Sequence, residues 1–337
     1  MVRRFEVKRL STYLVPTVHT TKIEHTLIRT GSLSHRESVS QKEDHPIKNP
    51  EVMAQEAQPM PEPTVAPLPL TEYKVLSFDV YGSLIEYKAH ILKSFTPLLS
   101  RLPKSSRYLD DSPLSATVSG VTSIGLVEFL KLFQRHEDSI KLEQPTRRFD
   151  EILREIWRRI ARDLDVESSE DEAQDFGSER NIANWPTFPG TIEALNKLSR
   201  HYKLVALSNI DRFAWSITSS SPCAPLGEVS WYRVFTAEDY PGHASAADAA
   251  KLEKMIEYVT SAGIKKEEIL HVAQSLGHDH APAKKLGLSS VFLVGDGPIW
   301  GKEAESKMAT EKALVGYAWR CKDLREFAEH VDKAWAS

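Results

Sequence analysis

Short apolar runs alternate with helical patterns along the second half of this chain of 337 residues. Strands of about four to eight apolar residues are typical of a parallel sheet that is covered on both faces. Alternating strands and helices form the usual repeating unit of such a sheet. The pattern therefore predicts an α/β fold, with a Rossmann-like parallel sheet and helices on both of its faces. The predicted strands are 203–207, 234–235, 269–273 and 290–294, and the predicted helices are 190–200, 212–219, 246–263 and 280–286.

One further strand lies well upstream, and it ends in an aspartate. Val75, Leu76 and Phe78 form a short apolar run, and Asp79 follows at the carboxyl end, where open α/β sheets bind their ligands. Gly82 then allows the chain to turn sharply. A carboxylate in this place can attack an electrophilic centre and form a covalent ester. Asp79 can equally cap the turn that follows, so the strand alone leaves both roles open.

A long block of helical patterns separates this strand from the rest of the sheet. The block has no place in the sheet, so we interpret residues 87–185 as a helical cap inserted over the site. The Rossmann-like core then comprises residues 71–86 and 186–337. The predicted helices of the cap are 87–100, 125–143 and 147–165, and its predicted loops are the Ser-rich stretch 103–123 and the acidic run 167–179.

The first 70 residues differ in composition from the rest of the chain. Residues 1–36 carry seven basic residues against two acidic ones, and residues 46–69 are rich in proline. Such segments cannot bury enough apolar surface to offset the entropy lost on ordering, so we predict a disordered tail and a linker over residues 1–70. A basic N-terminus also occurs in transit segments, so mitochondrial import stays an alternative to a cytoplasmic location.

Composition argues against several classes of partner. The formal net charge of −4 gives no general attraction to nucleic acid or to an anionic membrane. No segment approaches the roughly 18 consecutive apolar residues that span a bilayer. The two cysteines, Cys223 and Cys321, imply no disulfide framework and cannot form a zinc site unaided. We therefore expect a small-molecule substrate and leave a homodimer open.

Polar residues follow two further strands of the predicted sheet. Ser208 and Asn209 come after one strand, and the segment from Gln274 to Asp279 comes after another. Because parallel strands end at the same edge of a sheet, we expect these residues to meet Asp79 there. Ser208 and Asn209 can donate hydrogen bonds to an anion, although this pair is also ordinary turn chemistry. Asp279 can orient a water, anchor a lysine or bind a metal.

Two histidines, His278 and His280, flank Asp279 and suggest a metal site. Residues two apart at the start of a helix do not share one face. Two side chains on different faces cannot both ligate the ion, so we predict no metal at these histidines.

Four segments together resemble the haloacid dehalogenase superfamily, in particular its L-2-haloacid dehalogenase (type II) branch and the fungal-type hydrolases related to it. Each segment follows the family's order and its expected position at a strand end, and the resemblance covers about residues 72–295. It implies the fold predicted above, with Asp79 as the nucleophile. The segments are Phe78–Leu84, Phe188–Leu195, Leu207–Asp211 and Ile269–Ala283.

Tyr81 decides which reaction the resemblance implies. The phosphatases of the superfamily have a second aspartate in this place, which protonates the departing alkoxide, and a Mg²⁺ that neutralises the phosphate. A tyrosine with an ordinary pKa of about 10 is a much poorer acid for this task. A halide departs without a proton, so a dehalogenase needs neither the acid nor a metal. We therefore expect no cofactor, and Mg²⁺ only for a phosphatase.

The implied reaction has two steps. Asp79 displaces halide from C2 of a 2-haloacid and forms an ester, and water then hydrolyses the ester to release the 2-hydroxy acid. The resemblance also implies a role for each residue of the substrate site. Asn209 and Arg135 would cradle the halide, Ser83 and Ser208 would bind carboxylates, Asp279 would orient the water or a lysine, and Tyr81 would line the site.

Two segments depart from the family's pattern. The family has a lysine in a Lys-Pro setting after the third motif, and no Lys-Pro occurs in the corresponding segment here. Lys251 lies nearest to that place and flanks the apolar face of its helix, whereas Lys254 points nearly the opposite way. The alternative for Lys251 is an ordinary surface lysine. In the fourth motif, Gln274, Ser275 and Leu276 replace a Ser and an Asn, so Gln274 or Ser275 would have to position the water.

Three functions are consistent with these residues. The first is a metal-independent hydrolase that acts on a 2-haloacid or a related carboxylic acid through an Asp79 ester, with Lys251 and Asp279 as further catalytic residues. The second is a Mg²⁺-dependent phosphatase in which Asp79 and Asp279 bind the metal. The third is a non-catalytic relative that binds a partner or a metabolite, which the missing Lys-Pro supports. The motifs do not identify the substrate, because residues outside them select it.

Overall fold

The centre of the fold is a six-stranded sheet with the order β5-β4-β1-β6-β7-β8. All neighbouring strands run parallel, which confirms the predicted α/β class. The structure is a computed structural model that describes residues 60–118, 121–240, 247–294 and 314–337. Most of the predicted tail and linker, residues 1–59, lies outside the described residues. The strands are β1 (Val75–Asp79), β4 (Lys203–Leu207), β5 (Trp231–Phe235), β6 (Ile269–Ala273), β7 (Ser289–Leu293) and β8 (Trp319–Cys321).

Strand β1 lies in the middle of the sheet and is buried along its whole length. Asp79, its last residue, lies opposite Leu207, the last residue of β4. Because successive side chains of a strand point to opposite faces, Val75, Ser77 and Asp79 share one face of the sheet. The central strand therefore brings Asp79 to the carboxyl edge of the sheet, on a defined face.

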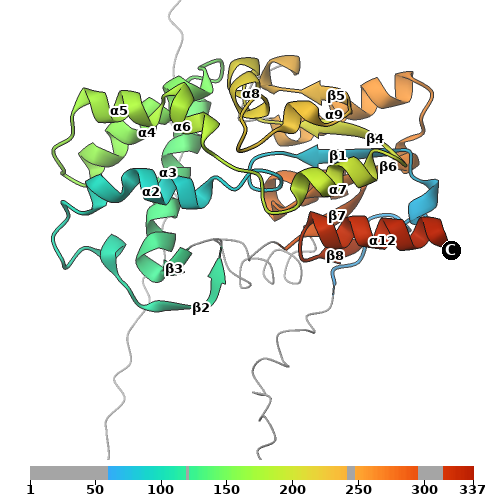
Figure 1. Ribbon diagram of the computed structural model, residues 1–337, viewed down its shortest axis with the longest axis horizontal. Coiled ribbons are helices and arrows are strands. Elements are labelled where there is room, and N and C mark those ends of the chain that lie inside the picture. The colour runs from blue at the N-terminus through green and yellow to red at the C-terminus, as the bar shows by residue number, and fades with distance from the viewer. Residues whose placement is uncertain (1–59, 119–120, 241–246, 295–313) are drawn as a thin grey trace, which may run out of the picture. The chain divides into compact units, whose positions relative to one another are not determined.

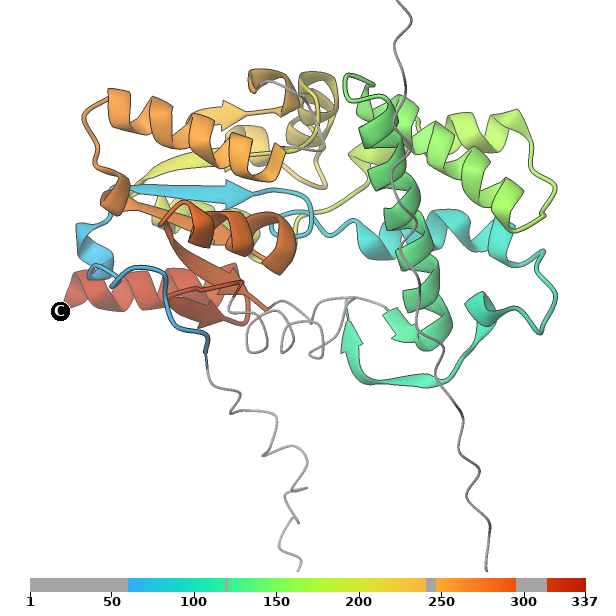
Figure 2. The same ribbon diagram turned by 180° about the vertical axis from the view of Figure 1, so that it is seen from behind.

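Helices cover both faces of the sheet (Figures 1 and 2). Helices α7 and α12 cover the face that carries Leu76 and Phe78, while α9 and α10 cover the face that carries Val75 and Leu207. Asp79 belongs to the second face, so its side chain points to the side of α9. The strand β8 and the helix α12 extend the core beyond the elements that the sequence predicted. The helices of the core are α7 (Thr191–Leu198), α8 (Arg212–Ser219), α9 (Ala247–Ser261), α10 (Ala281–Lys285) and α12 (Leu324–Ala336).

A helical insertion leaves the sheet after β1 and returns before β4, and the three helices predicted in it are confirmed. It has an aromatic core in which the rings of Phe95, Phe129, Trp157 and Phe176 are buried against one another. Among the described residues, no helix combines the length and the apolar character needed to cross a bilayer. The helices of the insertion are α2 (Lys88–Leu99), α3 (Ile124–Glu143), α4 (Phe149–Asp163), α5 (Glu170–Phe176) and α6 (Glu179–Ala183).

The prediction of a loop over the Ser-rich stretch 103–123 is wrong for its second half. The strands β2 (Pro113–Val118) and β3 (Val121–Ser123) form an antiparallel pair there. β-Branched residues such as Thr117 and Val121 favour extended backbone in spite of the serines around them. This local preference favours the two strands. The high serine content of the stretch led to the prediction of a loop instead.

The prediction that the acidic run 167–179 is a loop is also wrong, because α5 lies within it. Ser169 caps the helix by accepting a hydrogen bond from the backbone of Glu172, and the Glu172 side chain reaches back to the backbone of Ser169. This capping box satisfies N–H groups that the first turn leaves without partners. Acidic side chains at the start of a helix also face the positive end of its dipole, so the charge of the run favours the helix.

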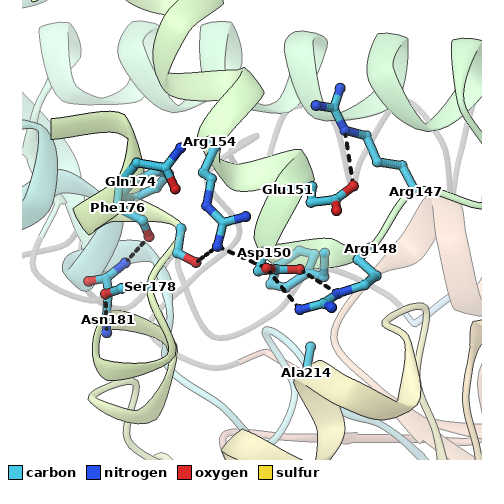
Figure 3. Close-up of polar contacts among 12 residues, drawn as sticks. Arg147, Arg148, Asp150, Glu151, Arg154, Gln174, Phe176, Ser178, Asn181 and Ala214 are labelled. Carbon is cyan, nitrogen blue, oxygen red and sulfur yellow. Dashed lines mark hydrogen bonds and ion pairs between the residues drawn. The ribbon is translucent and has the colours of Figure 1, made fainter. Parts of the chain in front are cut away.

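The start of α4 joins the insertion to the core. The backbone N–H of Phe149 donates to Asp211 Oδ2, while Asp211 Oδ1 accepts from the backbone N–H of Ala214 at the start of α8. One carboxylate thus caps two helices, one from the insertion and one from the core. Figure 3 shows the charges beside this contact, where Arg148 and Arg154 bind the buried Asp150 from two sides.

Candidate active site

Three charged side chains meet at the carboxyl end of β1. The Lys251 ammonium lies 2.9 Å from Asp279 Oδ1 and 3.9 Å from Asp79 Oδ1. At these distances one cation acts on both carboxylates, and the burial of the group strengthens the attraction. The structure therefore brings together the three residues that the sequence marked as candidates for catalysis.

Helix α9 delivers Lys251 because of its helical phase. Leu252, Met255 and Val259 are buried against the sheet, and Lys251 flanks this apolar stripe with a fully buried side chain. Lys254 lies on the outer face, is 44% exposed and pairs with Glu257. The alternative of Lys251 as a surface lysine is therefore wrong.

The three charges differ in their access to solvent. The Asp79 side chain is 12% exposed, whereas the side chains of Lys251 and Asp279 are 0% and 1% exposed. Of the three groups, Asp79 is the one that a substrate can reach. The geometry suits Asp79 as an attacking group and suits the other two as its support.

Behind Asp279 lies a histidine that the sequence analysis did not select. His271 Nε2 is 3.4 Å from Asp279 Oδ1, and His271 Nδ1 is 2.9 Å from Ser77 Oγ on the adjacent strand β1. With the proton on Nε2, Nδ1 can accept a hydrogen bond from Ser77 Oγ, whereas the contact between Nε2 and Asp279 is electrostatic and lacks hydrogen-bond geometry. The signal in the sequence was a single polar residue inside the apolar run Ile269–Ala273.

The two carboxyl groups have pKa values that differ in opposite directions from the ordinary value. Burial and the charge of Asp279 raise the pKa of Asp79 to about 7, although Lys251 and Ser83 oppose the rise. Burial acts to raise the pKa of Asp279 too, but Lys251 and His271 outweigh it and hold that pKa below its ordinary value. The contrast agrees with the distances, because Lys251 is closer to Asp279. Near neutral pH, Asp279 and Lys251 form a charged pair, and Asp79 is the group that exchanges a proton.

Ser83 connects Asp79 to the segment that follows β6. Its hydroxyl donates to Asp79 Oδ2 at 2.7 Å and accepts from the backbone N–H of Gln274 at 2.9 Å. Gly82 has a φ of 95°, in the left-handed region that favours glycine, and a Cβ there would lie 3.3 Å from Gln274 Oε1. The tight turn at Gly82 thus lets Gln274 lie close to the loop that follows Asp79.

The Tyr81 phenol is engaged in a contact of its own. Its hydroxyl forms a short hydrogen bond with Thr218 Oγ1 on α8. Burial raises the pKa of the phenol above its ordinary value, while the contact with Thr218 opposes the rise. The ring lies against Tyr87, Phe149 and Trp185, with ring centroids 5.8 to 6.3 Å away. Tyr81 is therefore a poor proton donor that contributes to an aromatic wall beside Asp79.

The end of β4 places Ser208 and Asn209 beside the end of β1, since Leu207 is the register partner of Asp79. The Tyr240 hydroxyl lies 3.0 Å from Asn209 Oδ1 and 3.0 Å from the Ser208 carbonyl oxygen. A hydroxyl held between these two oxygens fixes the amide oxygen of Asn209, which directs the amide N–H groups the opposite way.

Two predicted substrate-binding residues have other surroundings than expected. Ser275 Oγ accepts from the backbone N–H of His278 and begins the π-helical turn Leu276–His280, so its hydroxyl has a capping contact. Arg135 is exposed on α3, outside the buried stripe of that helix, and its charge acts on Glu128 and His136 of the same helix. The helical period already places Arg135 nearly opposite the apolar stripe of Phe129, Leu130 and Phe133, so its assignment to the site rested on the resemblance.

The two histidines around Asp279 have separate environments. His280 is buried, with Nδ1 2.9 Å from Ser290 Oγ and Nε2 3.0 Å from the Ala273 carbonyl oxygen. Burial lowers its pKa to about 4, so the ring is neutral at physiological pH. His278 is exposed. One histidine is thus buried and the other faces solvent.

Asp79 and Asp279 are the two carboxylates that a Mg²⁺ at this edge of the sheet would use. In the part of the chain that the structure describes, no three His, Cys, Asp or Glu side chains are placed to hold a metal. The Lys251 ammonium contacts Oδ1 of both carboxylates, whereas Asp279 Oδ2 accepts no hydrogen bond within the described residues. Magnesium binds proteins through one or two carboxylates together with waters and substrate phosphates, so a metal here would have to use the carboxylate oxygens that Lys251 does not contact.

Several solved structures share the architecture of this chain. The L-2-haloacid dehalogenase from Xanthobacter autotrophicus is similar with a TM-score of 0.54 and 15% identity, over 77% of this chain and 98% of that one. The α/β fold of this chain matches that of haloacid dehalogenase structures. The defluorinating L-2-haloacid dehalogenase Rha0230 gives a TM-score of 0.53 and 13% identity, over 79% of this chain and 100% of that one. The HAD-hydrolase YfnB from Bacillus subtilis, bound to magnesium, gives a TM-score of 0.52 and 13% identity, over 77% and 99% of the two chains.

Comparisons of sequence add no closer relative. No protein-family model matches the chain, and no curated protein matches it either. The similarity to haloacid dehalogenase structures therefore establishes the fold, and the activity rests on the geometry of the site.

Proposed function

We propose that this chain is a metal-independent hydrolase that converts a 2-haloacid to a 2-hydroxy acid. It would belong to the haloacid dehalogenase superfamily, in its fungal-type L-2-haloacid dehalogenase branch. The observation that carries the proposal is the Lys251 ammonium in contact with both Asp79 and Asp279. The neighbouring Tyr81 is bound to Thr218 and is a poor acid. We therefore expect a leaving group that needs no proton from a neighbouring acid, as a halide does.

In the first step, an oxygen of Asp79 attacks C2 in line with the carbon–halogen bond. The C–O bond forms as the halide leaves with the electron pair of the broken bond, and Asp79 becomes an ester. Ser83 and Lys251 hold the carboxylate in place for this attack. The amide N–H groups of Asn209 are directed away from Tyr240 and stabilise the departing halide.

In the second step, water attacks the carboxyl carbon of the Asp79 ester. One proton of the water ends on the hydroxyl of the product and the other passes to solvent, which restores the Asp79 carboxylate. In this proposal Asp279 Oδ2 holds the water, and the support is that this oxygen accepts no hydrogen bond within the described residues. Lys251 keeps Asp279 charged throughout, because its ammonium stays 2.9 Å from Oδ1.

In this proposal the helical insertion serves as the cap. Tyr87 and Phe149 belong to it, and their rings pack against the Tyr81 ring beside the nucleophile. Such a wall excludes water from the carbon under attack. We expect the enzyme to act on a small carboxylic acid and to work in the cytoplasm.

The decisive assay measures halide release from L-2-chloropropionate, and phosphate release from a generic phosphomonoester with Mg²⁺. We expect metal-independent halide release from the wild type and none from Asp79→Asn. Asp171→Asn, which removes an exposed carboxylate of the insertion, is the matched control and should keep full activity. Metal-dependent phosphate release with no halide release would instead establish a phosphatase, and silence in both assays would support a non-catalytic protein.

Labelled water tests the ester itself. In a single turnover in H₂¹⁸O, the hydroxyl oxygen of the product comes from Asp79 and carries no label, because water attacks the carboxyl carbon. After many turnovers, mass spectrometry should find ¹⁸O in the peptide that contains Asp79. A labelled product from the first turnover would show direct attack by water and contradict the ester.

A further inference from the structure

Lys88 is a second cation of the site, and neither the motifs nor the resemblance singles it out. It is the first residue of α2, at the point where the chain enters the insertion. Its Nζ lies 3.3 Å from Gln274 Oε1. The backbone N–H of Gln274 donates to Ser83, and Ser83 donates to Asp79 Oδ2. A continuous chain of contacts therefore joins Lys88 to the nucleophile.

The partner of Lys88 distinguishes it from other lysines of the insertion. Lys131 and Lys141 each bind a glutamate, at 2.7 and 2.6 Å. Within the described residues, the hydrogen bond of Lys88 goes to a neutral amide. A neutral acceptor compensates a half-buried ammonium less well than a carboxylate does.

The position of Lys88 on its helix adds to this imbalance. The first turn of α2 holds no acidic residue, and a cation there faces the positive end of the helix dipole. Burial lowers the pKa of Lys88 to about 8, although Glu86 and Asp79 act to raise it. The ammonium is thus still largely protonated at neutral pH, and an anion brought against it would restore a favourable pairing.

We propose that Lys88 binds the carboxylate of the 2-haloacid substrate. Lys88 would then be the cationic contact on the insertion side of the site. This inference rests on the proposed function, and it names the group that selects an anionic substrate. Lys251 is committed to Asp79 and Asp279, whereas Lys88 contacts an amide that a carboxylate can displace. In a 2-haloacid the carboxylate is bonded directly to C2, so a cation a few contacts from Asp79 holds the reacting carbon near the nucleophile.

The test measures binding of an unreactive carboxylate, so that it does not depend on turnover. Isothermal titration calorimetry with L-lactate compares the wild type, Lys88→Gln, Lys88→Arg and the control Lys93→Gln, which removes an exposed lysine of the same helix. We expect Lys88→Gln to bind at least about tenfold more weakly, since a charged hydrogen bond is lost. Lys88→Arg should restore most of the affinity, and Lys93→Gln should match the wild type. Lactamide, which lacks the charge, should not distinguish these proteins.

Equal affinity of Lys88→Gln and Lys93→Gln for L-lactate would overturn the inference, and so would an absence of lactate binding to the wild type. Thermal unfolding of each variant shows that a loss of affinity is not a loss of fold. Halide release from L-2-chloropropionate is measured on the same proteins. Lysine-dependent lactate binding without halide release would refute the proposed reaction and keep the anion site. Halide release with an unchanged KM in Lys88→Gln would keep the reaction and refute the role of Lys88.

Discussion

The two sides of the site are built differently. On the sheet side, Lys251 lies within 4 Å of both Asp79 and Asp279, and the two supporting groups are almost fully buried. On the insertion side, Lys88 contacts a neutral amide, and the remaining contacts are aromatic rings around Tyr81. The sheet side has its charges paired before any substrate binds, whereas the hydrogen bond of Lys88 on the insertion side goes to a neutral amide. We infer that the first performs the reaction and the second selects the molecule.

The largest expected effect comes from Lys251→Met. Removing this cation leaves two buried carboxylates with no positive partner, and breaking a buried ion pair commonly costs about 3–5 kcal/mol. We expect urea denaturation to show a loss of this order in the free energy of unfolding, together with loss of halide release. Lys254→Met, on the exposed face of α9, should change the free energy by less than about 0.5 kcal/mol. If both variants were equally stable, the sheet side would not depend on its buried lysine.

A second effect concerns pH. The pKa of Asp79 is raised to about 7, so its carboxylate, the form that attacks, is lost as the pH falls through this value. Halide release should therefore decline on the acid side of about pH 7. Asp279→Asn removes the charge that helps to raise this pKa, so the acid limb of its residual activity should move to lower pH. The opposite displacement in a pH–rate profile, or none, would contradict the coupling between the two carboxyls.

Tyr81→Phe should have a smaller effect. It removes the hydrogen bond to Thr218, but it keeps the ring within the aromatic wall. We expect halide release within roughly fivefold of the wild type and a loss of about 1 kcal/mol in stability. Tyr258→Phe, at the surface of α9, serves as the control for loss of a hydroxyl. A fall of a hundredfold or more, the usual effect of removing a general acid, would restore Tyr81 as a proton donor.

The smallest effect is expected at Arg135. Its side chain is exposed on α3, so Arg135→Gln should leave the KM for L-2-chloropropionate within about twofold of the wild type. Steady-state kinetics of this variant beside Lys88→Gln separates the two cations of the insertion. A large rise in KM for Arg135→Gln alone would assign the anion contact to α3 instead of α2.

The sheet side could be predicted from the sequence because its signals are periodic. Apolar runs place Asp79 and Asp279 after buried strands, and the helical phase of α9 favours Lys251 over Lys254. His271 escaped prediction because an apolar strand suggests packing, and only the pairing with Ser77 reveals a polar layer beneath the site.

The insertion side could be predicted less well. Arg135 and Lys88 both lie on predicted helices. Which face of each helix is turned towards the site depends on how the helices pack. Packing of that kind joins residues far apart along the chain, which no local pattern records. The helix α5 is a different case, since the spacing of Ser169 and Glu172 is a readable capping signal that the acidic composition obscured.

The central position of β1 has a consequence for how the protein is made. Both neighbours of this strand, β4 and β6, come later in the chain, and the contact between Ser77 and His271 spans 194 residues. The insertion between them closes its aromatic core through contacts of much shorter range, and local contacts form sooner. During synthesis the insertion can therefore fold while β1 still has no partner. The strand that bears Asp79 is fixed only after β6 has emerged, and until then its apolar side chains and unpaired backbone groups are open to aggregation.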